Sequence, residues 1–409
     1  MNARELCLLS LLPVCPLVAQ KPLPPVHDGA VLSGPGEFRY DGELLVKGRV
    51  TLRNMTLHLR GPIRVSAGAT LDIEDVHLLV ADPASAPNGT SGLRCEGPAH
   101  VIVRRSTMSP VNSAHPMWLL KGDLDVDSFA TTNSEFHLDS VHARIDGLKI
   151  FELEISRDSQ VSADGLDLVF LSTHSSENDH LRFENIPVDR AFSRTLDLGS
   201  GAHAQLKNTH IRFFLLYIHG QSSADLAHMG RVQLALSPDC EGTLHLPNGR
   251  LGSAAEPEIF PKPQTSNCPF HIGLNDVNVD TWDVYASGHT RLTLDHSKID
   301  ELIAGDHANI TVLDSIVYAD WLGVNGDANM RIENSTVGAL SLSGQRPDLA
   351  TSQIRITGRG RASFKRVRFD CGILAEDDGM VSIAQSLSQP KYIRTSGHAV
   401  IRTESPSGQ

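Results

Sequence analysis

The chain has 409 residues, of which 40% are hydrophobic, and this is enough for a large core in one or two domains. Its formal net charge at pH 7 is -12. An acidic chain repels phosphate groups, so the charge argues against nucleic acid as a partner and against binding to anionic membranes.

The first 20 residues have the pattern of a secretory signal peptide. Arg4 supplies a positive charge, an apolar run extends from Leu6 to Leu12, and a small-residue site for cleavage after Ala19 or Gln20 follows. No later stretch approaches the length of a transmembrane helix. We therefore expect a mature chain without membrane insertion. It would be secreted to the medium, to a periplasm or to the cell surface.

One short pattern recurs along the rest of the chain. It has alternating apolar residues, a polar turn pair and a further apolar residue, as in Leu52-Arg53-Asn54-Met55. In the C-terminal half the turn position recurs about every 20 residues, at Asp276, His296, Asp314 and Asn334. Glycine tolerates positive φ and suits a second corner in each repeat. The glycines with this spacing are Gly288, Gly305, Gly326, Gly344, Gly360, Gly379 and Gly397.

These repeats predict an all-β fold, a right-handed parallel β-helix (β-solenoid) with coils of about 20 residues. Short alternating strands with two corners per repeat form a coil rather than a series of hairpins. Each strand then pairs in parallel with its equivalent in the next coil, about 4.8 Å along the axis. We expect one domain over residues 21–409, with about 18 coils and a Pro-rich loop excursion near residues 252–269.

Four cysteines follow the signal peptide. Cys240 and Cys268 flank the Pro-rich excursion, so a disulfide bond between them is expected in an oxidising compartment. The alternative is four buried thiols, including Cys95 and Cys371.

The coils resemble the pectin-lyase-like superfamily of right-handed parallel β-helices over nearly all of the mature chain. Many members of that superfamily cleave acidic polysaccharides such as pectin or alginate, and others are adhesins or surface proteins without catalysis. Two of the four motifs of its polygalacturonase-type members have loose counterparts here, at Asn278-Val279-Asp280 and at Asp300-Glu301. The Gly-His-Gly and Arg-x-Lys motifs have none, so the resemblance implies an architecture and not one catalytic family.

The turn spacing predicts a pair of carboxylates on the outer face. If Asp276 and His296 stack, then Asp280 and Asp300 also stack about 5 Å apart, with Glu301 beside them. Such a pair suits general acid–base catalysis in a retaining glycosidase, because like charges raise one pKa. Asp280 and Asp300 would also suit Ca²⁺, the one cofactor that the pattern suggests. The alternative is a solvated acidic face that keeps the rod soluble.

Candidate substrate-binding residues follow in later coils. Tyr318 and Trp321 lie close to the acidic residues and offer a platform for stacking sugars. Lys365 and Arg368 suit the carboxylate or sulfate of an acidic glycan, and are otherwise surface charge. His296 is expected in a polar ladder that bonds successive turn backbones.

Two functions are consistent with these features. The first is a polysaccharide lyase or glycoside hydrolase that acts in a groove on the outer face. The second is a non-catalytic surface, adhesion or structural β-helix. In both cases the expected partner is a polysaccharide or a cell-surface glycan. The sequence contains no His-Glu-x-x-His and no paired-cysteine zinc motif.

Overall fold

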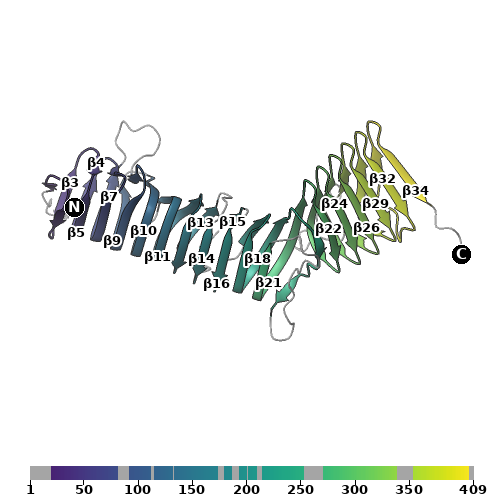
Figure 1. Ribbon diagram of the computed structural model, residues 1–409, viewed down its shortest axis with the longest axis horizontal. Coiled ribbons are helices and arrows are strands. Elements are labelled where there is room, and N and C mark those ends of the chain that lie inside the picture. The colour runs from purple at the N-terminus through teal and green to yellow at the C-terminus, as the bar shows by residue number, and fades with distance from the viewer. Residues whose placement is uncertain are drawn as a thin grey trace, which may run out of the picture.

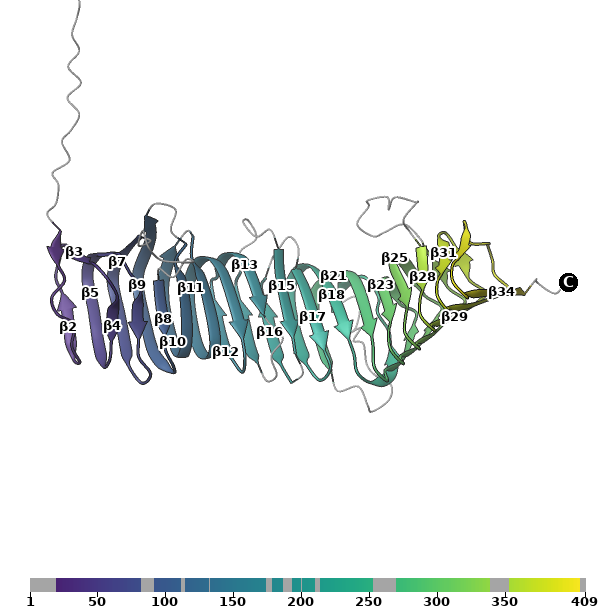
Figure 2. The same cartoon turned by 90° about the horizontal axis from the view of Figure 1, so that it is seen from above.

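The computed structural model describes residues 20–81, 92–111, 115–131, 133–173, 179–186, 193–199, 201–209, 214–252, 270–338 and 353–404, and all regular structure in these ranges is β-strand. The strands form a parallel β-solenoid of about 16 turns of roughly 20 residues. Figure 1 shows the coils stacked one on the next in a bent rod, and Figure 2 shows them in chain order from β3 to β34. The predicted fold class is therefore confirmed, with slightly fewer coils than expected.

The strands of the N-terminal part are β1 (Lys21–Pro22), β2 (Ala30–Ser33), β3 (Glu37–Tyr40), β4 (Leu44–Val46), β5 (Arg49–Leu59), β6 (Ile63–Val65), β7 (Thr70–Ala81), β8 (Gly92–Cys95), β9 (Ala99–Val111), β10 (Met117–Thr131), β11 (Glu135–Ser156), β12 (Gln160–Asp164), β13 (Asp167–Thr173), β14 (His180–Glu184), β15 (Ser193–Leu198), β16 (His203–Lys207), β17 (Phe214–His219) and β18 (Ser223–Ser237). The remaining strands are β19 (Glu241–Leu244), β20 (Gly249–Leu251), β21 (His271–Ala286), β22 (Arg291–Asp295), β23 (Lys298–Ala304), β24 (Asn309–Leu313), β25 (Ile316–Val324), β26 (Asn329–Glu333), β27 (Thr336–Val337), β28 (Gln353–Ile356), β29 (Arg361–Lys365), β30 (Arg368–Phe369), β31 (Gly372–Ala375), β32 (Met380–Ala384), β33 (Ile393–Thr395) and β34 (Val400–Glu404).

Alternation of apolar and polar residues fills the bore of the solenoid. In β5 the buried residues Val50 and Leu52 precede a corner at Asn54, and burial resumes at Met55 and Leu57. The corner restarts the alternation, so both arms of the strand point their apolar side chains inward. Burial of one such side chain contributes about 1.5–3 kcal/mol. Together these side chains form one continuous core from Leu23 to Ile383.

The predicted polar corner is present from coil to coil. Its residues have positive φ, a conformation that Asn and Asp adopt most readily. They include Asn54, Asp75, Asn185, Asn208, Asp276, His296, Asp314 and Asn334. The second, glycine corner is confirmed in part. Gly288, Gly326 and Gly397 have positive φ, whereas Asp306 takes this conformation next to Gly305 and Gly344 lies outside the described residues.

Buried serines fix the register after the corner in the C-terminal half. The Ser297 N–H donates to Ser315 Oγ at 2.9 Å, and the Ser315 N–H donates to Ser335 Oγ at 3.1 Å. Each hydroxyl thus satisfies a buried backbone donor of the preceding coil. This requirement explains the recurrent serine after His296, Asp314 and Asn334 in this half of the sequence.

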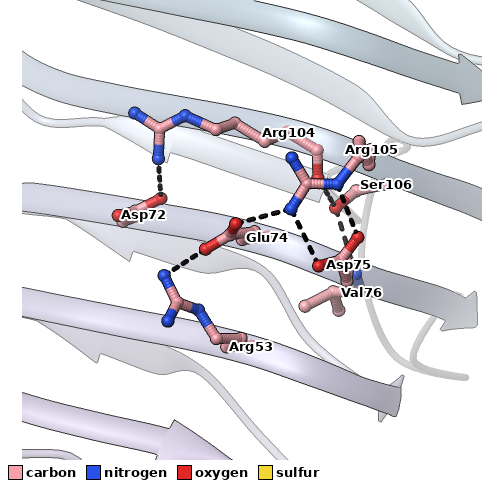
Figure 3. Close-up of polar contacts among 8 residues, drawn as sticks. All are labelled: Arg53, Asp72, Glu74, Asp75, Val76, Arg104, Arg105 and Ser106. Carbon is pink, nitrogen blue, oxygen red and sulfur yellow. Dashed lines mark hydrogen bonds and ion pairs between the residues drawn. The ribbon is translucent and has the colours of Figure 1, made fainter.

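Charged side chains connect the first coils on the outer face (Figure 3). Arg105 of β9 donates to Glu74 Oε1 at 2.5 Å and to the two oxygens of Asp75 at 2.9 Å each. Arg53 of β5 pairs with the other oxygen of Glu74. The Arg105 guanidinium lowers the pKa of both Glu74 and Asp75.

The solenoid bends where a new column of strands begins (Figure 1). The first half of β21 pairs with β18, so that Asn275 lies opposite Ala227. The next strand in the chain, β22, pairs instead with β19, and β19 is the first strand of a separate 7-stranded sheet. The second half of β21 continues the larger sheet, with Asp283 opposite Ala235 on one side and Glu301 on the other. One sheet therefore runs through the bend while another starts there.

This bend corrects the turn alignment expected from the sequence. His296, Asp314 and Asn334 do stack, because Leu313 lies opposite both Asp295 and Glu333. Asp276 stacks on His228 instead, with His228 Nδ1 at 3.4 Å from Asp276 Oδ2. The predicted stacking of Asp276 with His296 is wrong, because the segment between β18 and β21 contributes β19, on which the coil with His296 is built.

The cysteine predictions are only partly covered by the described residues. Cys240 is disulfide-bonded, and its predicted partner Cys268 lies outside these residues. Cys95 and Cys371 are free and buried, and burial raises the pKa of Cys371 to about 12. The predicted signal peptide is also outside the described residues, apart from Gln20. In the part of the chain that the structure describes, no helix has the length and hydropathy of a membrane span.

Candidate functional site

Carboxyl, amide and phenol side chains gather at the bend, on the outer face of the larger sheet. We call Tyr217, Gln233, Asp283, Tyr285 and Glu301 the bend cluster. Asp283 of β21 lies directly opposite Glu301 of β23, so their backbones are about 4.8 Å apart. Tyr217 of β17 lies two strands before Asp283, with only the small Ala235 between them.

Asp283 is buried although it faces outward. Trp282 and Val284 on either side of it belong to the core, and Asp283 itself is 1% exposed. Gln233 Nε2 donates to Asp283 Oδ2 at 2.5 Å. Burial raises the pKa of Asp283 to about 7, and the carboxylates of Glu301 and Asp300 act in the same direction, against the hydrogen bond from Gln233. Asp283 therefore holds a proton at mildly acidic pH, where most carboxyl groups are ionised.

Glu301 has different surroundings. The Tyr285 hydroxyl donates to Glu301 Oε2 at 2.5 Å. Burial, followed by this hydrogen bond, raises the pKa of Tyr285 well above its usual range, so the phenol stays protonated and continues to donate. The pair thus combines a shielded acid at Asp283 with a carboxylate at Glu301 held by a phenol. Two carboxyl groups with such different environments are typical of acid–base sites.

Asp300 and Tyr318 lie next to the bend cluster. Ile299 lies opposite Val317, which places Asp300 beside Tyr318 in the following coil. Burial and then the Asp300 charge raise the pKa of Tyr318. The predicted group of Asp300, Glu301 and Tyr318 is therefore close together. The backbone of Trp321 lies opposite Glu301, but its side chain is outside the described part of the structure.

Asp280 does not join this group as expected. It is the extra residue of a β-bulge, because Val279 lies opposite Val232 while Thr281 lies opposite Gln233. Its two carboxylate oxygens accept hydrogen bonds from Arg231 Nη2 at 2.8 Å and 2.7 Å.

The expected stacking of Asp280 on Asp300 is therefore wrong. Glu301 lies opposite Asp283, and Asp300 directly precedes Glu301. Asp280 lies three residues before Asp283, so Asp280 and Asp300 are out of register. The bulge and the bend have moved Asp280 out of line. A Ca²⁺ site made of Asp280 and Asp300 has no support from this register.

The predicted basic residues lie away from the bend cluster. Lys365 belongs to the 7-stranded sheet, opposite Glu333. Arg368 lies in the larger sheet opposite Thr336, with its Nε 3.8 Å from Asp370 Oδ2. Since β23, β25, β27 and β30 pair in that order, Arg368 is three coil steps, or about 14 Å, from the strand of Glu301.

Among the described residues, one group of three side chains already places ligand atoms within 4.8 Å of one another, and it consists of Asp295, His296 and Asp314. It lies on the polar corner of the 7-stranded sheet. His245 Nδ1 is 3.0 Å from the Asp295 carbonyl oxygen, and its ring centroid is 6.4 Å from that of His296. His296 thus belongs to the polar corner, and its chemistry is separate from the bend cluster.

Comparisons with protein-family models, with curated proteins and with solved structures found no match. The function must therefore be argued from the arrangement of the side chains.

Proposed function

We propose that this chain is a secreted β-solenoid of the pectin-lyase-like type that acts on an acidic polysaccharide at the bend cluster. The observation that carries the proposal is the pairing of Asp283 with Glu301 on adjacent coils. Asp283 has a pKa of about 7, and Glu301 is held by Tyr285. Perturbed carboxyl groups that lie side by side are typical of catalytic sites.

The two carboxyl groups have complementary roles in this proposal. Cleavage of a glycosidic bond requires a proton on the leaving oxygen, and Asp283 supplies it below about pH 7. The Glu301 carboxylate attacks the anomeric carbon as nucleophile, so the glycosidic bond breaks and the sugar is held on Glu301 as an ester. A backbone spacing of about 4.8 Å suits the retaining arrangement, in which the carboxyl groups are about 5–5.5 Å apart. The ionised Asp283 then takes a proton from water, the water oxygen displaces the sugar from Glu301, and both carboxyl groups return to their starting states.

Arginines on the neighbouring sheet favour an acidic polymer. A hollow of about 420 Å³ lies over the outer face of the 7-stranded sheet and is lined by Arg331, Arg361 and Arg402. Arg331 already donates to Glu333 at 2.5 Å. Arg361 and Arg402 are better placed to hold the carboxylates of uronic acids, because guanidinium groups bind carboxylates in a bidentate manner.

A polysaccharide panel tests this function. The mature protein would be incubated with pectins, alginates, glycosaminoglycans and neutral glycans, with and without Ca²⁺. Ultraviolet absorbance detects unsaturated products, and a reducing-end assay detects hydrolysis. We expect Asp283→Asn and Glu301→Gln each to reduce the rate by about 10²–10⁴-fold. Asp280→Asn, the matched control, keeps the activity because Asp280 is engaged by Arg231. Absence of products from every polymer contradicts catalysis.

Non-catalytic binding is the second candidate function, and the 1% exposure of Asp283 favours it. In that case the polysaccharide binds without cleavage, and the affinity depends on Arg361 and Arg402 rather than on Asp283. Glycan-array binding by wild type, by Arg361→Gln/Arg402→Gln and by Asp283→Asn separates the two functions.

A further inference from the structure

A column of histidines runs along the outer face of the N-terminal part, separate from the bend cluster. Nine paired strand positions carry, in order, Thr70, His100, Asp123, His142, Gln160, His180, His203, Ser223 and His271. Five of these nine are histidine, although the whole chain has only 19 among 409 residues. None is Lys or Arg. This concentration goes well beyond what scattered surface histidines would give, so the column calls for a chemical explanation.

The histidine column lies in a hollowed surface. A hollow of about 580 Å³ is lined by side chains that include His100, His142, His180 and His203. A second hollow of about 460 Å³ shares Arg182 and Gln205 with the first and extends to Asp225. A small ligand or ion can therefore reach the column from solvent.

Three side chains from successive coils lie side by side at the end of this column, with ligand atoms that do not all lie within 4.8 Å of one another. Asp225 lies between two imidazoles, with His203 Nε2 at 3.8 Å from Oδ2 and His271 Nε2 at 3.5 Å from Oδ1. The other nitrogen of His203, Nδ1, is 2.7 Å from Ser223 Oγ. A hydrogen bond at the second ring nitrogen is the arrangement that orients a histidine when it binds a metal.

Gly273 makes room for this arrangement. It lies opposite Asp225, and a Cβ at this position would be 2.4 Å from Asp225 Oδ1. Its φ lies outside the left-handed region, so the backbone conformation does not require glycine. Glycine inside a strand weakens the strand and often marks a close approach. Here the missing side chain lets the Asp225 carboxylate lean toward His271.

We propose that His203, Asp225 and His271 form a binding site for a divalent transition-metal ion such as Zn²⁺. Two imidazole nitrogens and one carboxylate oxygen are a common ligand set for Zn²⁺, with a fourth position left for water or another ligand. His180 is a candidate for that position, because its ring centroid is 6.4 Å from that of His203. The site is independent of the function proposed for the bend cluster.

Calorimetric titration of the chelator-treated mature protein with Zn²⁺ tests the site. We expect one strong equivalent in the wild type. In His203→Gln/His271→Gln the affinity falls by more than tenfold, because even outer-shell changes at zinc sites cost about 10–100-fold. Gly273→Ala, which removes no ligand, has a similar effect, since the added methyl group displaces the Asp225 carboxylate.

Two control variants separate loss of the site from loss of the fold. Gly323→Ala adds a methyl group to another strand glycine, where the nearest atoms are 3.9 Å away, and keeps Zn²⁺ affinity. His398→Gln also keeps it, since His398 lies outside the proposed site, with its Nδ1 at 3.4 Å from Asp378 Oδ1. Melting curves of the metal-free variants check that each has folded.

Three results overturn the proposal. They are no heat of binding up to millimolar Zn²⁺, unchanged affinity in His203→Gln/His271→Gln, and loss of the strong equivalent in His296→Gln instead. The last result would assign the metal to the corner group of Asp295, His296 and Asp314.

Discussion

Asp283 occupies an outward position between two core residues, yet its carboxyl group is shielded from water. Ionising a carboxyl group in such surroundings is costly, so the folded protein retains the proton to a higher pH than the unfolded chain does. Groups that reduce stability in this way are kept where function uses them. The same property gives a direct prediction about stability.

Replacement of Asp283 by Asn is expected to stabilise the protein at pH 8. On folding, the pKa rises from 3.8 to about 7, so the folded state binds the extra proton between these values. Stability therefore falls as pH rises from about 4 to 7, and the loss is complete above 7, at no more than about 4 kcal/mol. Melting temperatures at pH 4 and pH 8 measure the effect. Equal gains at both pH values would contradict the account.

Asp280→Asn is the matched control for that comparison. Asp280 sits on the same strand but is paired with Arg231 at 2.7 Å. Its neutralisation removes a favourable contact, so the variant is no more stable than the wild type at pH 8.

At the scale of strands and corners, buried serines and surface ion pairs hold neighbouring coils in register. In the C-terminal half, Ser315 and Ser335 each follow a corner and accept a backbone N–H that lies too deep for water. The ion pairs of Arg105 lie on the surface, where solvent weakens them, so their contribution is smaller and depends on pH.

Ser315→Ala is expected to cost about 1–3 kcal/mol, because it leaves the buried Ser297 N–H without its acceptor. Thermal unfolding measures the loss. Ser363→Ala, on the outer face of β29, serves as the comparison and should change stability by less than about 0.5 kcal/mol. Equal effects in the two variants would show that the serine hydroxyls do not hold the corner.

Arg105→Gln should lower the melting temperature at pH 7 and have little effect near pH 2. Arg105 lowers the pKa of Glu74 and Asp75, so its stabilisation is present above their unfolded pKa values and disappears as pH falls through the lower folded values. Arg60→Gln removes a looser contact, 3.6 Å from Asp41, and should have less effect. A loss that is the same at both pH values would point to packing rather than charge.

The sequence predicts the repeating elements well, because each coil repeats the same local rules. Alternation identifies the inner face, and positive φ at Asn54 or Asp314 follows from the turn chemistry. The candidate site is harder to predict, because it depends on register between coils. The bulge at Asp280 and the insertion of β19 shift that register, so Asp283 rather than Asp280 faces Glu301. Counting residues within one coil cannot reveal either event.

At the scale of the whole molecule, the bend joins two stacks that share one continuous sheet. The chain between β18 and β21 forms β19, the first strand of the 7-stranded sheet. The bend cluster lies on the larger sheet, which continues through the bend. Cys240 lies at this junction and is disulfide-bonded. A disulfide bond here would lower the conformational entropy of the Pro-rich excursion in the unfolded chain.

A non-reducing peptide map is expected to link Cys240 to Cys268. Opening this loop by Cys240→Ser should cost about 3–4 kcal/mol in the chain-entropy account, and reduction should have the same effect. Cys371→Ser, at a free buried thiol, is the comparison and should not change the map. A link from Cys240 to another cysteine would contradict the predicted pairing.

The central claim is that the bend holds a carboxylic acid that keeps its proton to near-neutral pH. The most direct test is a pH titration of ¹³C-carboxyl aspartate signals in the wild type and in Asp283→Asn. The account predicts one aspartate signal that titrates near pH 7 and disappears in the variant. If every aspartate titrates below about pH 5, as ordinary carboxyl groups do, then Asp283 is not the acid that the proposed function requires.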